Sequence, residues 1–360
     1  MNEKKLVYVG LSGGVDSSVA AKRLLDAGYR VVGAYMKNWT RDIAGNRCPW
    51  EDDLLSAKSV AAHLGIELKV FDLQAEYKQL VVDAMVHAYE SGETPNPDIL
   101  CNQEIKFRIF YNLCREAGAD MVATGHYATI KPVVADSQVG EKSIRFRLAQ
   151  AEDKSKDQTY FLYRMPVMSA EHVLFPLGDS LKSTIRGEAQ SAQLPTAQRR
   201  ESMGLCFVGK IPLKDFLGEF TTLTPGDIIN QEGKVIGQHD GALLYTIGQR
   251  HGLGVGGGTP YYVVSKDIVA NTVTVTTDPT VLRRSHYDIT NCHWWADPDL
   301  SREYQVRIRH LGELLACSLE KMSDDAYRIH LVGDSHRGVA SGQHAVLYDG
   351  DLVLGGGVLV

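Results

Sequence analysis

The chain has 360 residues, of which 44% are hydrophobic and 23% are charged, as in an ordinary soluble protein of two or three domains. Its net charge of −6 argues against a protein that coats nucleic acids, although a local basic groove is compatible with it. The N-terminus lacks the pattern of a secretory signal, no run approaches the roughly 20 apolar residues of a membrane-spanning helix, and the cysteines form no C-x-x-C zinc pattern. We therefore expect a cytoplasmic protein with reduced thiols.

The first part of the sequence alternates short apolar runs with helix-like stretches. Strands are predicted at residues 5–11, 30–36, 66–73 and 120–125, and helices at about 16–27, 52–64, 76–91 and 101–117. This alternation predicts an α/β domain with a parallel sheet and helices on both faces. In such a domain the ligand site lies at the carboxyl ends of the strands.

The second part of the sequence has the texture of antiparallel β-structure. After about Thr196, Gly and Pro become frequent and β-branched residues alternate along the chain. The last segment, AVLYDGDLVLGGGVLV, indicates two strands around an Asp-Gly turn. We predict an α/β domain over residues 1–206, a small central domain over 207–272, an antiparallel β-barrel or sandwich over 273–360, and an exposed loop or hairpin tip at 132–143.

The strongest local signal is the segment SGGVDS at residues 12–17, between the first predicted strand and helix. Glycines let the backbone approach an anion closely, and a helix N-terminus points unpaired N–H groups at it. Asp16 could cap the helix or bind a metal ion attached to a phosphate. The segment matches neither the Walker loop nor the dinucleotide fingerprint. It resembles the pyrophosphate loop of enzymes that cleave ATP to AMP and pyrophosphate; a plain turn capped by Asp16 is the alternative.

Two cysteines lie in settings where a thiol could react. Cys101 follows Asp98 and the prolines at 95 and 97, which predict an extended backbone leading into a helix whose dipole would favour a thiolate. Asp98 could exchange a proton with a substrate base. Taken alone, this segment favours a buried cysteine with Asp98 as a helix cap.

The second cysteine, Cys206, follows Arg199 and Arg200, which could lower the pKa of its thiol or hold RNA phosphate. Taken alone, a cysteine between Leu and Phe is typical of a protein core. The other four cysteines are predicted to be structural; they are Cys48, Cys114, Cys292 and Cys317.

An adenylating loop together with two candidate thiols suggests sulfur transfer. A uracil carbonyl oxygen is a poor leaving group, and attachment of AMP corrects this. One cysteine would carry a persulfide, and the other would resolve it by forming a disulfide. An iron–sulfur cluster held by Asp98, Cys101 and Cys206 with one open position is the alternative. We prefer the persulfide and expect no tightly bound cofactor.

Over nearly its whole length the chain resembles the tRNA-specific 2-thiouridylases, the MnmA/TrmU family. Six blocks carry the resemblance, in family order: GLSGGVDSSVA, TPNPDILCN-x-x-IKF, ATGHYA, DKSKDQTYFL, MGLCFVGK and GQHDGALLYTIGQRHGLGVGGG. It implies a pyrophosphatase-loop (adenine nucleotide α-hydrolase-like) domain, a small central domain and a C-terminal β-barrel that faces tRNA. It also implies that ATP with Mg²⁺ activates the wobble uridine, position 34, in tRNAs for Lys, Glu and Gln. A persulfide donor or relay protein would supply the sulfur that gives 2-thiouridine.

The resemblance assigns roles to individual residues. Cys101 would be the nucleophile, Cys206 the persulfide carrier, and Asp98 the acid or base beside the target uracil. The residues implied to line the ATP site are Gly10, Leu11, Ser12, Gly13, Gly14, Val15, Asp16, Ser17, Met36 and Gly125. Those implied to contact tRNA are Asn96, Pro97, Asp98, His126, Lys156, Asp157, Gln158, Arg307, Ile308 and Gln343.

Three positions depart from the family pattern. Ala123 stands where Gly is expected, Ile308 where an aromatic residue is expected, and Ser341 where Pro is expected. The last two bear on the contacts of the barrel rather than on the chemistry.

Two other functions fit parts of the sequence. Argininosuccinate synthase, GMP synthase and NAD synthetase use the same loop on small molecules, but none needs two cysteines in these settings or a basic C-terminal β-domain. A tRNA-binding module without chemistry would need neither an intact loop nor both thiols. Binding of tRNA without ATP hydrolysis would favour that module.

Overall fold

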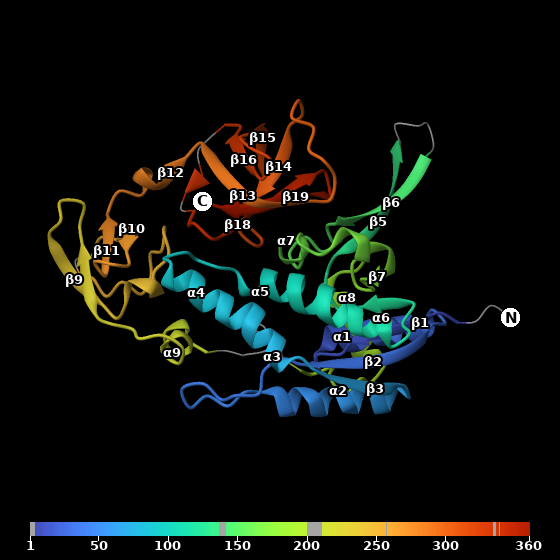
Figure 1. Cartoon of the computed structure of the whole chain (residues 1–360). Coiled ribbons are helices and arrows are strands. Elements are labelled where there is room, and N and C mark those ends of the chain that lie inside the picture. Colours follow the sequence, from blue (N-terminus) through green and yellow to red (C-terminus); the bar gives the residue numbers. More distant parts are fainter. Residues whose placement is uncertain (1–3, 137–141, 200–210, 257, 334–335, 338) are drawn as a thin grey trace. The chain divides into compact units, whose positions relative to one another are not determined.

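The computed structural model describes residues 4–136, 142–199, 211–256, 258–333, 336–337 and 339–360 (Figure 1). The chain forms two compact units, each of which gathers separate stretches of sequence. The first unit comprises Met1–Val81, Pro97–Lys210 and Asp349–Val353, and the second comprises Val82–Asn96, Ile211–Tyr348 and Leu354–Val360. Within the described ranges, no helix has the length and apolar character needed to cross a membrane.

A five-stranded parallel sheet forms the centre of the first unit. In sheet order it consists of β3 (Glu67–Asp72), β2 (Arg30–Lys37), β1 (Leu6–Gly10), β4 (Met121–Ala123) and β7 (Val173–Leu174). The chain leaves β1 toward β2 and β3 on one side, and β4 lies on the other side. This reversal of direction beside β1 is where sheets of this kind bind their ligands, just beyond the carboxyl ends of the strands.

Helices cover both faces of this sheet, which confirms the prediction of an α/β domain. α1 (Val15–Asp26), α2 (Trp50–Leu64) and α8 (Lys182–Ser191) pack on the face that carries Val9 and Tyr35. Successive strand residues point to opposite faces, so Met36 and its partner Phe71 belong to the other face. There Phe71 meets Phe110 edge to face, with ring centroids 5.7 Å apart.

Phe110 belongs to one continuous helix made of α5 (Pro97–Leu100), η2 (Cys101–Phe110, wound as a π-helix) and α6 (Tyr111–Glu116). Figure 1 shows α5 and α6 on one side of β2 and β3, and α2 on the other side. The shorter helices of this unit are α3 (Gln74–Tyr77), the first part of η1 (Lys78–Asp83), α7 (Thr159–Leu162) and η3 (Val167–His172).

A long antiparallel hairpin extends from the first unit. It consists of β5 (Thr129–Asp136) and β6 (Lys142–Ala149). Residues 132–136 and 142–143 of the predicted loop or hairpin tip therefore belong to paired strands, and residues 137–141 lie outside the described residues. At its base, Ala149 pairs with Leu352.

The central part of the second unit is a four-stranded sheet in the order β10 (Tyr262–Asp267), β11 (Thr272–Thr276), β8 (Gly226–Ile229) and β9 (Val235–His239). Its core contains Ile228, Val263 and Val273, which are fully buried. The accompanying helices are α4 (Ala84–Glu90), α9 (Leu213–Gly218), η4 (Ala242–Leu244) and η5 (Pro279–Leu282).

A closed antiparallel barrel completes the second unit. Its strands follow the order β13 (His286–Trp294), β16 (Ala326–Leu331), β15 (Leu315–Lys321), β14 (Tyr304–Arg307), β18 (His344–Asp349) and β19 (Leu352–Leu359), and β19 pairs back to β13. The short strands β12 (Arg283–Arg284) and β17 (His336–Arg337) pair with each other. Closure decides between the barrel and the sandwich that the sequence left open. The predicted Asp-Gly turn is present, with Gly350 at φ +63°.

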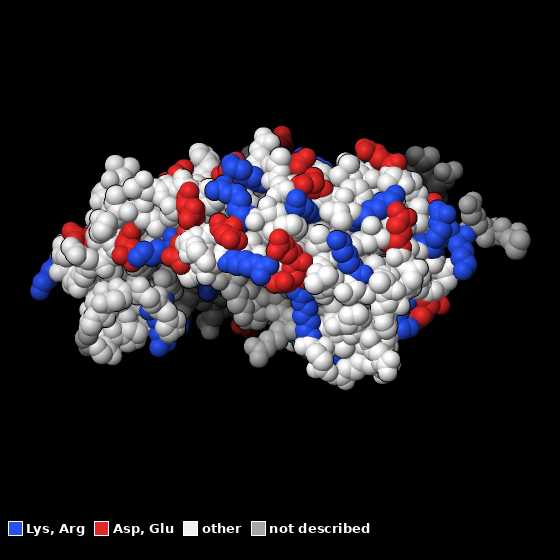
Figure 2. Space-filling view, turned by 90° about the horizontal axis from the view of Figure 1, so that it is seen from below, with Lys and Arg blue, Asp and Glu red and all other residues white. Residues whose placement is uncertain are grey.

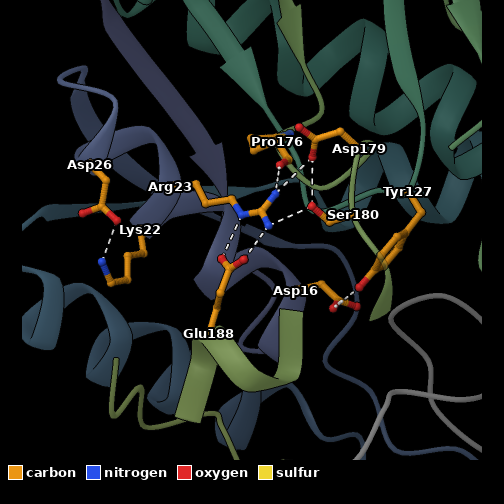
Figure 3. A network of polar contacts seen from close by, with 9 residues as sticks. All are labelled: Asp16, Lys22, Arg23, Asp26, Tyr127, Pro176, Asp179, Ser180 and Glu188. Carbon is orange, nitrogen blue, oxygen red and sulfur yellow. Dashed lines mark hydrogen bonds and ion pairs between the residues drawn. The ribbon is translucent and has the colours of Figure 1, made fainter. Parts of the chain in front are cut away.

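Arg23 ties α1 to α8 in the first unit (Figure 3). Its guanidinium donates to both carboxylate oxygens of Glu188, at 2.9 and 2.6 Å, in a bidentate pair. It also donates to the carbonyl oxygen of Pro176 at 2.7 Å and to Ser180 Oγ at 2.8 Å. The hydrogen bonds from Arg23 hold the pKa of Glu188 below its usual value. One side chain thus fixes the position of α8 against α1, the helix that follows the phosphate loop.

We predict that Arg23→Ala lowers the free energy of unfolding of the first unit by about 1–2 kcal/mol, because it breaks a charge-assisted pair and leaves a partly buried carboxylate unpaired. Lys22→Ala is the matched control, since Lys22 pairs with the exposed Asp26 one turn away, at 2.6 Å. Such a surface pair contributes no more than about 0.5 kcal/mol. Urea unfolding of both variants measures the difference, and equal losses would contradict the bracing role.

Candidate active site

The phosphate loop connects β1 to α1 and is built around two glycines. Gly13 has φ +78°, which glycine adopts without strain, and a Cβ there would lie 2.5 Å from the carbonyl oxygen of Asp53. Gly14 precedes α1 in an extended conformation and gives no side-chain cap. Its carbonyl accepts hydrogen bonds from Ser17 Oγ at 3.2 Å and Ser18 Oγ at 2.7 Å. Because no side chain caps α1, the N–H groups of its first turn form an anion-binding end.

The other predicted loop residues contribute mainly backbone. Leu11 and Val15 are buried, and Val15 packs in the core between α1 and the sheet. Ser12 Oγ lies 3.3 Å from Ser17 Oγ and 3.4 Å from the N–H of Gly14, so it closes the turn.

Gly125 brings the end of β4 against the start of α1. A Cβ at this position would lie 2.7 Å from the backbone nitrogen of Ser17, so any side chain here would collide with the loop. On the other side of β1, Met36 Cε lies 3.5 Å from the position that a Cβ on Gly10 would take. The structure therefore gathers the predicted ATP residues of β1, β2 and β4 at one edge of the sheet.

Asp16 on the loop is held by Lys182 and by Tyr127, of which Figure 3 draws Tyr127. Lys182 Nζ donates to both carboxylate oxygens of Asp16, at 2.6 and 2.8 Å, and Tyr127 Oη donates to Asp16 at 2.9 Å. The ammonium also lies 5.3 Å from the centre of the Tyr127 ring. Our sequence interpretation missed Lys182, because a lysine at the start of a late helix carries no local signal of its distant partner.

A second cation contacts the loop from the opposite flank. Arg199 Nη1 donates to the carbonyl oxygen of Gly13 at 2.7 Å, and Arg199 Nη2 pairs with Asp53. Burial raises the pKa of Asp53, and the positive charge of Arg199 opposes that shift. The sequence indicated that Arg199 could lower the pKa of the Cys206 thiol or hold RNA phosphate; the structure places its guanidinium at the phosphate loop. Arg200 and Cys206 lie outside the described residues.

Asp98 and Cys101 occupy the start of the helix that covers the Met36 face. The helix begins at Pro97, so Cys101 lies one turn inside it, and its side chain is fully buried. Asp98 is half-buried; burial raises the pKa of its carboxyl, and the charge of Lys106 partly offsets this. A raised pKa lets a carboxyl exchange protons closer to neutral pH.

His126 links this helix to the end of β4. His126 Nε2 lies 3.2 Å from Lys106 Nζ, and Nδ1 lies 2.7 Å from Thr124 Oγ1. An ammonium can only donate, so Nε2 accepts and the ring proton resides on Nδ1, which donates to Thr124. Burial, reinforced by the charge of Lys106, lowers the pKa of His126 well below 6.5. His126 is therefore a neutral imidazole with both nitrogens in use.

The segment Lys156-Asp157-Gln158, predicted to face tRNA, has a partly internal role. Asp157 is fully buried and accepts hydrogen bonds from the N–H of Ala151 at 3.1 Å and from Thr159 Oγ1 at 2.7 Å. Gln158 Oε1 accepts from the N–H of Tyr127 at 2.9 Å. These two side chains shape the backbone beside Tyr127, and Lys156 is half-buried.

The remaining predicted tRNA contacts belong to the second unit. Ile308 lies in the barrel core, so an aromatic residue at this position would also point inward. Arg307 is buried, with its guanidinium 5.4 Å from the ring of Tyr348. Gln343 Oε1 is buried without a hydrogen-bond partner among the described residues. Asn96 also belongs to this unit and is half-buried.

The departure at Ser341 is accommodated by its backbone. Its carbonyl accepts a hydrogen bond from the N–H of Thr94 at 2.8 Å, an interaction that the carbonyl of a proline would provide equally. The adjacent Gly342, at φ +85°, lies against Thr94 so closely that a Cβ would be 2.9 Å from its nitrogen.

No three His, Cys, Asp or Glu side chains within the described part of the chain gather as a metal site. A cluster site formed by Asp98, Cys101 and Cys206 is not tested by this finding, because Cys206 lies outside the described residues.

We predict that His126 stays neutral and protonated on Nδ1 at pH 6, which NMR of the isotopically labelled protein measures directly. Lys106→Met removes a like charge and should raise the pKa of His126, although burial continues to hold it low. A histidine that titrates near 6.5, or that carries its proton on Nε2, would contradict the arrangement.

Comparison with known proteins places the site in a family. Domain models described as tRNA methyl transferase HUP domain, tRNA methyl transferase PRC-barrel domain and aminomethyltransferase beta-barrel domain match residues 5–210, 214–277 and 284–359. The tRNA-specific 2-thiouridylase MnmA of Methylobacillus flagellatus is 41% identical over 99% of both chains, and MnmA 2 of Aliarcobacter butzleri is 38% identical over 100% of this chain and 99% of its own. A solved 4-thiouridine synthetase in complex with RNA and ATP is more distant, with a TM-score of 0.36 and 15% identity over 57% of this chain and 46% of that one. On the full-length identity to these relatives, the chain belongs to the family of tRNA-specific 2-thiouridylases.

Proposed function

We propose that this chain is an ATP-dependent tRNA-uridine 2-sulfurtransferase that converts the wobble uridine 34 of tRNAs for Lys, Glu and Gln to 2-thiouridine. One arrangement carries the proposal. β1 leads into the phosphate loop, β4 leads into Gly125 and His126, and His126 contacts Lys106 of the helix that carries Asp98 and Cys101. A nucleotide on the loop therefore has an acid or base and a thiol-bearing helix beside it.

The first step activates the base. O2 of the uracil attacks the α-phosphorus of ATP, a P–O bond forms, and pyrophosphate leaves. The N-terminus of α1 and the cations flanking the loop stabilise the negative charge that develops on the phosphates. Mg²⁺ bound to ATP would take Asp16, the acidic residue of the loop, as a ligand and would help the pyrophosphate to depart.

The second step exchanges oxygen for sulfur. The terminal sulfur of a Cys206 persulfide attacks C2 of the activated uracil, and the C2–O bond breaks to release AMP. The Cys101 thiolate then attacks the inner sulfur, which leaves the terminal sulfur on C2 and joins the two cysteines in a disulfide. The persulfide sulfur is reduced as the two thiols are oxidised, so a cellular thiol reductant must reopen the disulfide before the next turnover.

Asp98 and His126 differ in what they can do for this reaction. The raised pKa of Asp98 suits a group that takes and returns a proton on the uracil ring. His126 has both ring nitrogens engaged by Lys106 and Thr124, so it would position the helix rather than transfer a proton.

The drawn face of the molecule is of mixed charge. On the face drawn in Figure 2, Lys and Arg are interspersed with Asp and Glu rather than gathered in one basic field. We therefore propose that tRNA is held by local contacts rather than by one basic field. We also propose a three-part organisation of residues 1–206, 207–272 and 273–360, in which the barrel faces tRNA. A persulfide donor or relay protein and a cytoplasmic location complete the proposal.

The matching domain models carry names that refer to methyl transfer, whereas the full-length relatives carry names that refer to thiolation. We favour sulfur transfer because an adenylating loop and a reactive thiol serve it, whereas methyl transfer from a methyl donor needs neither.

The proposal predicts that the protein, incubated with unmodified tRNA, Mg-ATP and a cysteine-desulfurase persulfide supply, forms 2-thiouridine detectable by mass spectrometry of the digested RNA. Omission of ATP, Cys101→Ala or Cys206→Ala should abolish the product while tRNA binding persists. Cys114→Ala is the matched control, since this thiol lies buried in the same helix at its far end.

Failure to form 2-thiouridine with an active donor system would contradict the proposal and favour another reaction of the pyrophosphatase-loop class. A visible charge-transfer band in anaerobically purified protein, lost on Cys101→Ala, would replace the persulfide route with the iron–sulfur alternative.

A further inference from the structure

Asn38 is a buried amide that the described protein does not satisfy. It follows directly after β2, and only 1% of the residue is exposed. Both Oδ1 and Nδ2 lack a hydrogen-bond partner among the described residues. Buried side-chain amides are nearly always hydrogen-bonded, because an unpaired one loses its hydrogen bonds to water and gains none in the protein. An asparagine in this state calls for a ligand-dependent role.

The position of Asn38 places it beside the nucleotide site. The N–H of Leu73 donates to the carbonyl of Lys37 at 3.0 Å, so extended pairing persists to the last residue of β2. Alternation along the strand then puts Asn38 on the same face as Met36. Met36 in turn lies against Gly10, where β1 enters the phosphate loop.

The sheet order decides which part of the nucleotide would reach this side. His126 follows β4 on one side of β1, and it contacts Lys106 of the helix that precedes β4 and carries Asp98 and Cys101. The α-phosphate must face them, since it is the reacting group. The base of a nucleotide whose phosphates rest on the β1–α1 loop therefore extends to the other side, over the end of β2.

The chemistry of the amide matches that base. Asparagine offers an acceptor and a donor side by side, the pattern that pairs in a bidentate manner with the 6-amino group and adjacent ring nitrogen of adenine. We propose that Asn38 is a specificity residue that reads the adenine of ATP, with Oδ1 accepting from the 6-amino group and Nδ2 donating to a ring nitrogen. The inference rests on the proposed use of ATP, but not on the identity of the sulfur acceptor.

The base must displace part of the segment that follows Asn38 to reach the amide. This segment has internal hydrogen bonds, such as Trp39 Nε1 to the carbonyl of Arg41 at 2.8 Å and the N–H of Cys48 to Asp42 Oδ1 at 2.9 Å. It also contacts α3, where Thr40 Oγ1 donates to Gln74 Oε1 and Trp39 packs edge to face on Tyr77. A shift that uncovers the amide breaks these contacts with α3 but leaves the strand pairing of the sheet intact.

The test is nucleotide binding by the full chain, measured calorimetrically without tRNA. The probes are Mg-ATP and the Mg complex of purine ribonucleoside triphosphate, which lacks the 6-amino group. The unaltered protein should prefer ATP by at least about tenfold. Asn38→Ala and Asn38→Leu should each weaken ATP binding by about tenfold and remove the preference, while binding of the purine analogue changes little.

Two further readouts separate recognition from folding. Asn38→Leu replaces an unpaired amide with an apolar group of similar size, so the melting temperature of the nucleotide-free protein should stay equal or rise. Asn46→Ala is the control, since Asn46 is exposed in the same segment and donates from Nδ2 to the carbonyl of Ile43 at 3.3 Å. It should keep both the affinity and the preference.

Three outcomes would overturn the inference. Asn38→Ala could retain the ATP preference, or both Asn38 variants could weaken the two nucleotides equally with a fall in melting temperature, which would make Asn38 structural. Loss of thiolation with ATP binding intact would assign the amide to the acceptor instead. Because binding is measured without tRNA, a failure of the thiolation assay would leave this result unaffected.

Discussion

The rest of the site depends on a close backbone approach around the start of α1. Gly125 lies against Ser17 so tightly that a Cβ would be 2.7 Å from its nitrogen, and a Cβ on Gly13 would be 2.5 Å from the carbonyl of Asp53. Two positions without side chains thus let the end of β4 and the start of α2 touch the same loop. This contact brings residues from three separate stretches of the chain together around the proposed phosphate site.

Charge pairing around that loop sets how a triphosphate can enter. Asp16 is paired with Lys182, and Asp53 with Arg199, so each flank of the loop holds a cation beside an anion. A nucleotide bound as proposed would compete with Asp16 for the ammonium of Lys182, and Mg²⁺ would then supply a new positive partner for Asp16. A single cation also acts on two groups near β4, because the charge of Lys106 lowers the pKa of both Asp98 and His126. For Asp98 this opposes the rise in pKa that burial causes, and for His126 it adds to the fall in pKa that burial causes.

Much of this could be predicted from the sequence, and the remainder follows a physical pattern. Strand–helix alternation and the SGGVDS segment depend on residues that are close in the chain, so the parallel sheet and the loop could be predicted from the sequence. The partners of Lys182 and Arg199 lie more than a hundred residues away, and no local pattern encodes them. Asp157 is a charged residue and was therefore predicted to lie at the surface. It is buried instead, because the N–H of Ala151 and the hydroxyl of Thr159 donate hydrogen bonds to its carboxylate. Asn38 gave no signal, since an unpaired amide is visible only once its surroundings are known.

In the proposed reaction, the oxygen of the target uracil leaves with AMP. The most direct measurement uses tRNA with ¹⁸O at O2 of uridine 34, a single turnover with Mg-ATP and persulfide, and mass spectrometry of the nucleotide products. Adenylation predicts that the label appears in the phosphate of AMP, one atom for each 2-thiouridine formed. Label found in water or in pyrophosphate, with AMP unlabelled, would contradict the activation of the base by ATP.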